Sequence, residues 1–245
     1  MTRYVINKVR LELEKLGVLV DVHNIEGFKA ESADLSVYGA VGFAYPVHSF
    51  NAPEIVTGFA KRLPKTDAKS AFIISTAGGE SPANYASSRL LINILSKKGF
   101  DVFYNRQFIM PSNFMVKDGE AKVSQNIAAA NEAAPQTAQE IINCTEFQQP
   151  KSFAALVLQF FGRAEQPCAK LMGKFFYADE NCSMCGICAE NCPNNNITID
   201  SGRMKFKSCC GLCMRCLYMC PNKSLKVRRP FKFIRFDRWY DNCEF

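Results

Sequence analysis

The feature that most constrains this chain is a cysteine pattern that occurs twice near its C-terminus. Each copy reads C-x2-C-x2-C-x3-C-P, and the second copy follows the first at an offset of 28 residues (210 minus 182). The first copy consists of Cys182, Cys185, Cys188 and Cys192, and the second of Cys210, Cys213, Cys216 and Cys220. Cysteine thiolates at this spacing hold iron-sulfur clusters. The two copies therefore predict two [4Fe-4S] clusters and the transfer of single electrons.

The spacing also predicts how the ligands are shared between the clusters. Three thiolates on one tight loop bind one face of a cluster, and the fourth cysteine of each motif ligates the other cluster. We therefore expect one cluster on Cys182, Cys185, Cys188 and Cys220, and the second on Cys210, Cys213, Cys216 and Cys192. Gly186 leaves room for backbone N–H groups near the first cluster, whereas Met214 holds the equivalent position in the second loop. We expect the two clusters to differ.

Zinc is the alternative occupant of these cysteines, because closely spaced C-x2-C pairs also bind zinc. Zinc motifs usually separate two ligand pairs by a dozen or more residues. They do not require three evenly spaced cysteines plus a fourth before proline, twice over. The pattern favours iron-sulfur clusters over zinc, and over a disulfide framework.

The rest of the composition says less about function. The net charge of +7 lies entirely in residues 151–245, where two clusters ligated by thiolates would offset part of it. Four further cysteines, namely Cys144, Cys168, Cys209 and Cys243, are expected to be buried apolar or inert surface residues, although Cys209 could replace Cys210 as a ligand. No secretory signal is recognisable, so we expect a cytoplasmic protein in an environment with little oxygen.

The first 145 residues alternate helical and strand-like patterns, which predicts an α/β fold with a parallel sheet. Helices are expected at residues 2–16, 52–62, 84–98 and 121–143, and strands at 18–25, 39–45, 70–75 and 101–110. In the first helix Val5, Val9, Leu13 and Leu16 share one face, and Gly17 ends it. The strand cores 40–45 and 71–74 are continuously apolar, as in strands buried on both faces. Ligands of such sheets bind at the carboxyl ends of the strands.

Three segments at those ends resemble a known family. GFAYPVHSFNAP at 42–53, STAGGE at 75–80 and MPSNF at 110–114 are similar to the flavodoxin-type domain of bacterial flavodoxin-ferredoxin fusion proteins. With the doubled cysteine motif, the resemblance covers nearly the whole chain. It implies an α/β flavodoxin-like parallel sheet in residues 1–143, a helical connector in 144–175 and a small α+β bacterial ferredoxin-like module in 176–227.

The resemblance also implies FMN as a cofactor of the first domain. Its ring would lie between the loops 45–51 and 76–79, with Tyr45 or Phe50 stacked on it. The implied binding residues are Thr2, Tyr45, Phe50, Asn51, Thr76, Ala77, Gly78 and Gly79. His48 reads as a loop hydrogen-bonding residue more than as a catalytic acid.

In the family a first strand and a phosphate loop precede the first helix, and this sequence starts at the end of that loop. The flavodoxin-like sheet is therefore expected to be truncated at its N-terminus. Two interpretations are open: the start was assigned at an internal methionine, or the protein has lost its flavin. The retained pattern of the remaining domain favours the first.

Two further segments carry competing interpretations. Residues 152–161 are strongly apolar but too few to cross a bilayer, so we expect a helix packed between domains rather than one on a membrane surface or partner. The tail 228–245 alternates basic and aromatic residues, which suits single-stranded nucleic acid, an acidic redox partner or packing on the first domain. We expect redox partner proteins, no nucleic acid and no transmembrane segment.

Taken together, the patterns predict an electron-transfer protein that passes single electrons between two [4Fe-4S] clusters and FMN. The alternative is a flavin-dependent reductase of a small substrate, fed by the cluster module. A third hypothesis is a nucleic-acid-binding or structural protein in which the clusters only support the fold.

Overall fold

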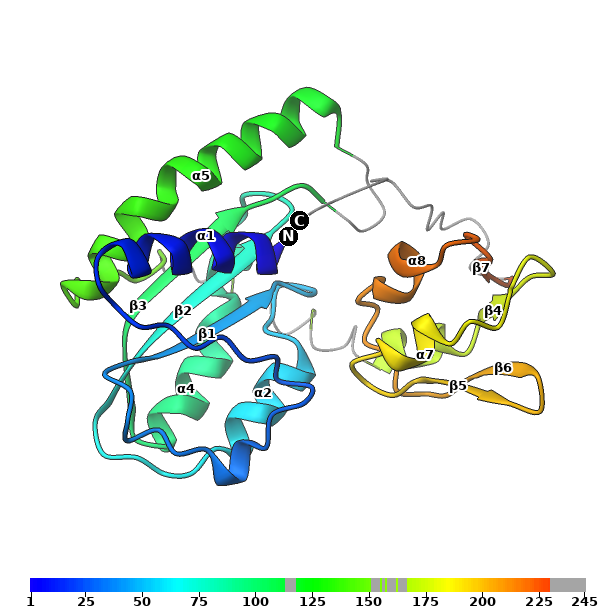
Figure 1. The fold of residues 1–245 in the computed structure, drawn as a ribbon, viewed down its shortest axis with the longest axis horizontal. Coiled ribbons are helices and arrows are strands. Elements are labelled where there is room, and N and C mark those ends of the chain that lie inside the picture. Colours follow the sequence, from blue (N-terminus) through cyan, green and yellow to red (C-terminus); the bar gives the residue numbers. More distant parts are fainter. Residues whose placement is uncertain (113–117, 151–154, 156, 158–161, 163–166, 230–245) are drawn as a thin grey trace. The chain divides into compact units, whose positions relative to one another are not determined.

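The computed structural model describes residues 1–112, 118–150, 155, 157, 162 and 167–229. The described residues form two compact units, the first comprising residues 1–111, 118–150, 155, 157 and 162 and the second residues 112 and 167–229 (Figure 1). Each unit has its own hydrophobic core. The predicted apolar helix at 152–161 and the tail from residue 230 onward fall largely or wholly outside the described residues.

The first unit is built on a three-stranded parallel sheet, as the sequence predicted for its fold class. Its strands are β1 (Val41–Pro46), β2 (Lys69–Ala77) and β3 (Phe100–Ile109), in the order β1-β2-β3. In register, Phe43 lies opposite Ile73, and Ile73 lies opposite Asn105. The sheet is therefore an α/β sheet with β2 at its centre.

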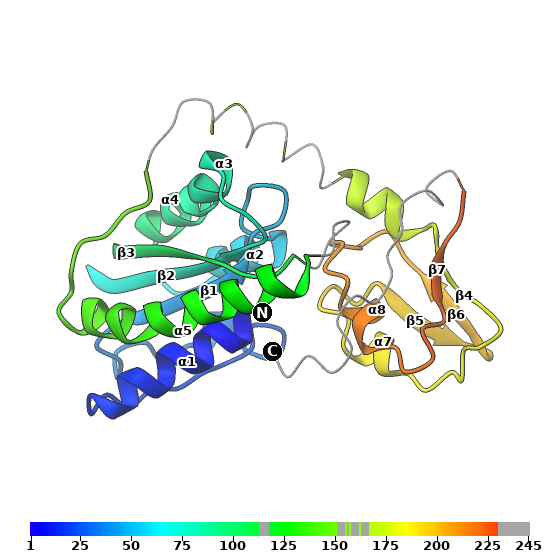
Figure 2. The ribbon, with the colours of Figure 1, turned by 90° about the horizontal axis from the view of Figure 1, so that it is seen from above.

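Helices cover both faces of this sheet (Figure 2). On one side lie α1 (Thr2–Lys15) and α5 (Glu120–Ile142), and on the other α2 (Glu54–Arg62) and α4 (Arg89–Lys97). Shorter elements are η1 (Ala30–Ser32), α3 (Pro82–Tyr85) and η2 (Ala86–Ser88). Two apolar cores result, one on each face, as expected for a sheet between two helical layers.

Helix α1 confirms the predicted first helix almost to the residue. Val5, Val9 and Leu13 recur every four residues and are buried against α5 and the sheet. Gly17 has a φ of +83°, the left-handed conformation that ends a helix. Leu16, however, lies beyond the helix and is 48% exposed, so its predicted place on the buried face is wrong.

The strand predicted at residues 18–25 does not form. This segment lacks regular structure, and Leu19 is 97% exposed. A strand needs a neighbour to satisfy its backbone hydrogen bonds. Among the described residues, no strand pairs with the outer edge of β1.

The expectation that β1 is buried on both faces is wrong. Phe43 and Tyr45 are buried, but Gly42 and Ala44, which alternate with them, are exposed, so only one face of this strand is covered. By contrast β2 is buried on both faces from Ile73 to Ala77, as predicted for a central parallel strand.

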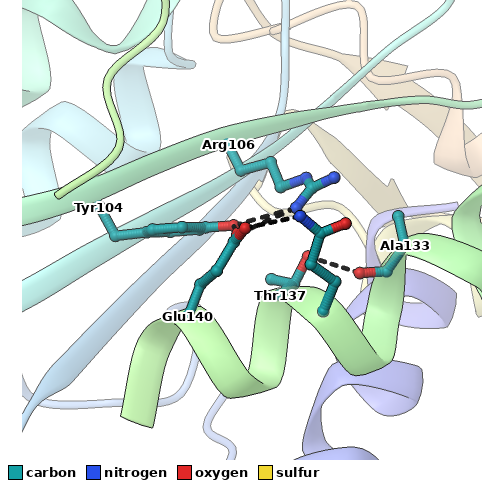
Figure 3. Close-up of polar contacts among 6 residues, drawn as sticks. Tyr104, Arg106, Ala133, Thr137 and Glu140 are labelled. Carbon is teal, nitrogen blue, oxygen red and sulfur yellow. Dashed lines mark hydrogen bonds and ion pairs between the residues drawn. The ribbon is translucent and has the colours of Figure 1, made fainter. Parts of the chain in front are cut away.

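The outer edge of β3 is covered by the segment that follows α5. The N–H of Asn105 donates to the carbonyl of Phe147 at 2.7 Å, and the N–H of Phe147 donates to the carbonyl of Phe103 at 3.1 Å. Polar side chains attach α5 to the same strand (Figure 3): Glu140 Oε2 accepts from Tyr104 Oη at 2.6 Å and from Arg106 Nη1 at 3.1 Å.

The second unit contains two short antiparallel pairs and two one-turn helices. Strand β4 (Phe176–Ala178) pairs with β7 (Leu225–Val227), and β5 (Ile197–Asp200) pairs with β6 (Arg203–Phe206). The second pair forms a short hairpin with its turn at Ser201 and Gly202. Helices α7 (Ile187–Glu190) and α8 (Arg215–Met219) each follow a cysteine loop. The described residues 167–173 are also helical.

No helix in the described parts of the chain is long and apolar enough to cross a membrane.

Candidate functional site

The second unit contains two recesses, and each is lined by one of the two predicted ligand sets. The larger, of about 440 Å³ counted to its open mouth, is lined by Cys192, Cys210, Cys213 and Cys216. The smaller, of about 320 Å³ counted in the same way, is lined by Cys182, Cys185, Cys188 and Cys220. We name the smaller one recess A, because the first copy of the motif supplies most of its cysteines, and the larger one recess B. In both, the fourth cysteine comes from the other copy of the motif.

Apolar side chains form much of the remaining wall. Recess B is also lined by Phe176, Ile197, Phe206, Leu212 and Met214, and recess A by Ile187, Met204 and Leu225. These residues belong to the core of the second unit or pack against it, except Ile187, which begins α7. Soft sulfur donors in an apolar wall suit a thiolate-ligated metal centre of low solvent access.

Among the described residues, no group of three or more cysteine, histidine, aspartate or glutamate side chains is arranged to hold a metal ion. The four cysteines of each predicted ligand set are nonetheless among the residues that line one recess.

The two cysteine loops share an uncommon backbone conformation. Residues with positive φ recur at the offset of 28: Met184 and Leu212 (+55° and +48°), Gly186 and Met214 (+82° and +59°), and Asn195 and Lys223 (+49° and +50°). Positive φ is rare for residues other than glycine. Its repetition indicates that both copies wrap their recess in the same way, with or without a glycine.

Burial raises the pKa of the enclosed thiols. It raises the pKa of Cys210 to about 11, and it also raises the pKa of Cys188, Cys213 and Cys216. At Cys220 burial acts in the same direction, but hydrogen bonds from Ser224, Asn222 and Leu225 outweigh it and lower the pKa. Enclosed thiols of this kind ionise when a positively charged centre binds them.

None of the described cysteines outside the motif lines a recess. Cys144, Cys168 and Cys209 are exposed, and none of them lines either recess. The backbone N–H of Cys209 donates to Asn196 Oδ1 at 2.7 Å, which holds the start of the second loop. Cys243 lies outside the described residues.

In the first unit, two predicted flavin-binding residues meet at the carboxyl end of the sheet. The hydroxyls of Thr2, in the first turn of α1, and Thr76, near the end of β2, are 2.7 Å apart. The N–H of Val47 donates to the carbonyl of Thr76 at 2.8 Å, which draws the loop after β1 to the same place. This end of the sheet therefore brings together the first helix and both predicted loops.

The loop after β1 contains a tight turn that presents Phe50. His48 and Asn51 exchange backbone hydrogen bonds of 3.0 and 2.8 Å across Ser49 and Phe50, which have φ of +49° and +62°. Asn51 is buried, and its Nδ2 donates to the carbonyl of Ser49. Phe50 is half-buried at the tip of this turn.

Tyr45 does not share that position. It is 1% exposed within the core, and its hydroxyl lies 3.5 Å from Ser87 Oγ. Its ring is enclosed by other side chains, whereas Phe50 is half-buried. Phe50 is therefore better placed than Tyr45 to stack on a flavin, and the stacking role stays a prediction.

The loop after β2 leaves open space beside its backbone. Thr76 and Ala77 are buried, Gly78 is exposed, and a Cβ added to Gly79 would meet no heavy atom within 4 Å. The carbonyl of Gly79 accepts from Asn84 Nδ2 at 2.8 Å, which fixes the turn into α3. A planar ligand could approach this backbone closely.

His48 lies in the first of these loops. Although part of its surface stays exposed, burial lowers its pKa to about 4. The imidazole is therefore neutral at pH 7, and this histidine supplies no strongly acidic proton.

Sequence reasoning missed three residues that bear on the recesses, namely Gly173, Asn196 and Ser224. A Cβ at Gly173 would lie 2.2 Å from Cys210 Cβ, so this helical glycine packs directly on a cysteine of recess B. Asn196 and Ser224 occupy equivalent positions in the two copies (196 plus 28 is 224), a relation that the offset could have revealed. No pattern in the sequence marks Gly173.

Comparison with known proteins gives little further information. No protein-family model and no curated protein matches the chain. Among solved structures it is similar to the metal-soaked Flv1 flavodiiron core from Synechocystis sp. PCC6803, at 18% sequence identity and a TM-score of 0.38. That match covers 58% of this chain and 33% of the other, so this chain spans about a third of that structure's length. We therefore argue function from this chain's own residues.

Proposed function

We propose that this protein transfers electrons by means of two [4Fe-4S] clusters held in a ferredoxin-like second unit, and exchanges them with redox partner proteins. The observation that carries the proposal is that each recess is lined by one complete predicted ligand set, including the crossed fourth cysteine. A motif spacing and a three-dimensional enclosure thus lead to the same two groups of four residues.

The chain's own residues have three tasks in this function. The eight cysteine sulfurs bind the clusters, the apolar walls limit contact with water, and backbone N–H groups donate to the sulfurs. When bound, iron-sulfur clusters exchange electrons one at a time, at potentials set by hydrogen bonds and solvent exposure. The walls and N–H donors therefore determine how readily an electron enters each centre.

We further propose that the first unit is flavodoxin-like and binds FMN. Three observations support this: the contact between the hydroxyls of Thr2 and Thr76, the hydrogen bond from Val47 to Thr76 that brings the loop containing Phe50 to the same end of the sheet, and the open space beside the backbone of Gly79. Thr2 belongs to the first turn of a 14-residue helix, whose N–H groups and dipole favour a phosphate. FMN accepts one or two electrons, so it would connect paired donors with single-electron centres.

The burial of Tyr45 and the lowered pKa of His48 favour an electron carrier over the alternative of a flavin-dependent reductase. Such an enzyme needs a proton donor beside its substrate. His48 is the only histidine in the candidate flavin loops, and its pKa of about 4 leaves it neutral at pH 7. Burial likewise raises the pKa of Tyr45, and its hydroxyl faces Ser87 inside the core.

The first test is the metal and flavin content of the protein purified without oxygen. We expect about eight irons and eight acid-labile sulfides per chain, as two cubane clusters require. Cys185→Ser should reduce the iron content, whereas Cys209→Ser, in a cysteine that lines neither recess, should not. Zinc without sulfide would overturn electron transfer.

The flavin part has its own test. Gly79→Val adds a side chain in open space, so the fold should keep its melting temperature while FMN binding is lost. Ser36→Ala, in an exposed loop of the same unit, serves as the control. Full iron content without any FMN binding in the wild type would remove the flavin proposal and leave the clusters.

A further inference from the structure

The two copies of the cysteine motif differ at one buried position beside the fourth cysteine. Asn196 lies four residues after Cys192, and Ser224 lies four residues after Cys220. Their exposed fractions are 2% and 1%. In both copies the backbone N–H at this position donates to the cysteine sulfur, at 3.2 Å for Asn196 and 3.3 Å for Ser224.

The side chains at this position do different things. Asn196 Oδ1 turns to the second loop and accepts the N–H of Cys209 at 2.7 Å. Ser224 Oγ instead lies 3.3 Å from Cys220 Sγ. A ligating thiolate carries no proton, so the hydroxyl must be the donor when Cys220 binds a metal centre. Cys220 thus receives a side-chain hydrogen bond that Cys192 does not receive from its equivalent residue.

We propose that Ser224 is a positioning residue that raises the reduction potential of the centre in recess A through its hydrogen bond to Cys220. This inference rests on the proposed function. A donor aimed at a ligand sulfur stabilises the more negative, reduced form of the centre, and so raises its potential. The hydroxyl acts on recess A, because Cys220 lines that recess and not recess B.

The asymmetry has a consequence for the path of the electron. Two centres with identical surroundings would share an electron equally. The hydrogen bond from Ser224 raises the reduction potential of the centre in recess A, so the electron occupies that centre more often than it would without the hydroxyl. Ser224 is also well placed to hold this geometry, because its carbonyl accepts the N–H of Asp179 at 2.9 Å beside the β4–β7 pair.

The test is an anaerobic redox titration of the full chain, followed by electron paramagnetic resonance. Ser224→Ala removes the hydroxyl but keeps the backbone N–H. Loss of a hydrogen bond to a charged acceptor should weaken electron binding in recess A about tenfold, which is ~59 mV for a one-electron couple. The centre in recess B should keep its potential. The signal that changes in Cys185→Ser identifies recess A.

Two further variants separate this effect from a loss of structure. Ser224→Thr keeps a hydroxyl and should restore the potential. Ser201→Ala removes an exposed serine hydroxyl that bonds Asp200 in the hairpin turn, and should change neither centre. Iron and sulfide content should equal that of the wild type in all three variants.

The outcomes that overturn the proposal are distinct. Three results at full iron content would each refute the role of Ser224 while leaving the clusters in place. They are an unchanged potential in Ser224→Ala, an equal shift of the potentials of both centres, and a Ser224→Thr variant whose potential is not restored. A wild-type protein without iron and sulfide refutes the proposed function, and this inference with it.

Discussion

At the scale of single residues, the loops around the recesses contain positive φ angles at positions where the residue type does not predict them. Gly186 takes positive φ without cost, but Met184, Leu212 and Met214 do so as ordinary residues. Conformations of this kind cost about 1–3 kcal/mol each and persist only when the surroundings impose them. The sequence therefore predicted the ligand sets from their spacing, whereas the left-handed positions became visible only in the fold.

A first prediction at the residue scale concerns the aromatic residue that stacks on the proposed flavin. Phe50→Leu keeps apolar bulk at the tip of the turn but removes the ring. We expect FMN to bind about two- to tenfold more weakly, because aromatic stacking contributes about 0.5–1.5 kcal/mol beyond the buried area. Isothermal titration calorimetry measures this. Tyr45→Phe is the control and should leave FMN affinity unchanged, since Tyr45 lies inside the core. Equal losses in both variants would contradict the assignment of Phe50.

The crossed fourth cysteine is a second prediction at the residue scale. Cys192 lines recess B together with Cys210, Cys213 and Cys216. Cys192→Ala should therefore abolish or alter the spectroscopic signal of the centre in recess B and spare the other. Cys209→Ala, next to the second loop but outside both recesses, should preserve both signals. Loss of the recess A signal instead would show that the ligands do not cross.

At the scale of elements, the sequence predicted those that pack or pair with another described element. Helix α1 and the central strand β2 both formed where the patterns placed them. The segment 18–25 has a strand-like composition but no strand beside it, so its backbone stays out of the sheet. The composition of a segment gives its preference for the β conformation, but a strand forms only where a neighbouring strand pairs with it.

The helix at residues 167–173 is coupled to recess B through Gly173. Any side chain there would place its Cβ 2.2 Å from Cys210 Cβ, closer than two carbons can approach. We expect Gly173→Ala to displace Cys210 and to lower the iron content of recess B, at a cost of about 1–3 kcal/mol in stability. Iron analysis and thermal unfolding measure the two effects.

A matched control for this variant lies beside the same cysteine. In Gly211→Ala the new Cβ would meet Asn194 Nδ2 at 2.7 Å, which is the movable end of a side chain. This variant should keep its iron. If Gly173→Ala also kept full iron content and its recess B signal, the helix would not constrain Cys210.

At the scale of the whole molecule, the two units differ in what stabilises them. Apolar residues on both sides of a sheet form the cores of the first unit. The second unit has a small core that includes cysteines of both recesses, Cys188, Cys192 and Cys216. Small domains with such limited cores usually depend on bound metal or disulfides.

Metal removal should therefore unfold one unit and spare the other. After treatment with a chelator under reducing conditions, we expect amide hydrogen exchange to rise sharply in residues 176–227 and to stay unchanged in residues 41–109. Mass spectrometry of peptides measures both regions in one experiment, and reconstitution with iron and sulfide should reverse the change. A uniform rise across the chain would contradict the independence of the two cores.

The crossed lining of the recesses also bears on synthesis of the protein at the ribosome. Recess A begins with Cys182 and is enclosed only when Cys220 has been added, 38 residues later (220 minus 182). Recess B already has its last cysteine at Cys216. A nascent chain therefore completes the two recesses within four residues of each other (220 minus 216), so neither ligand set is available well before the other.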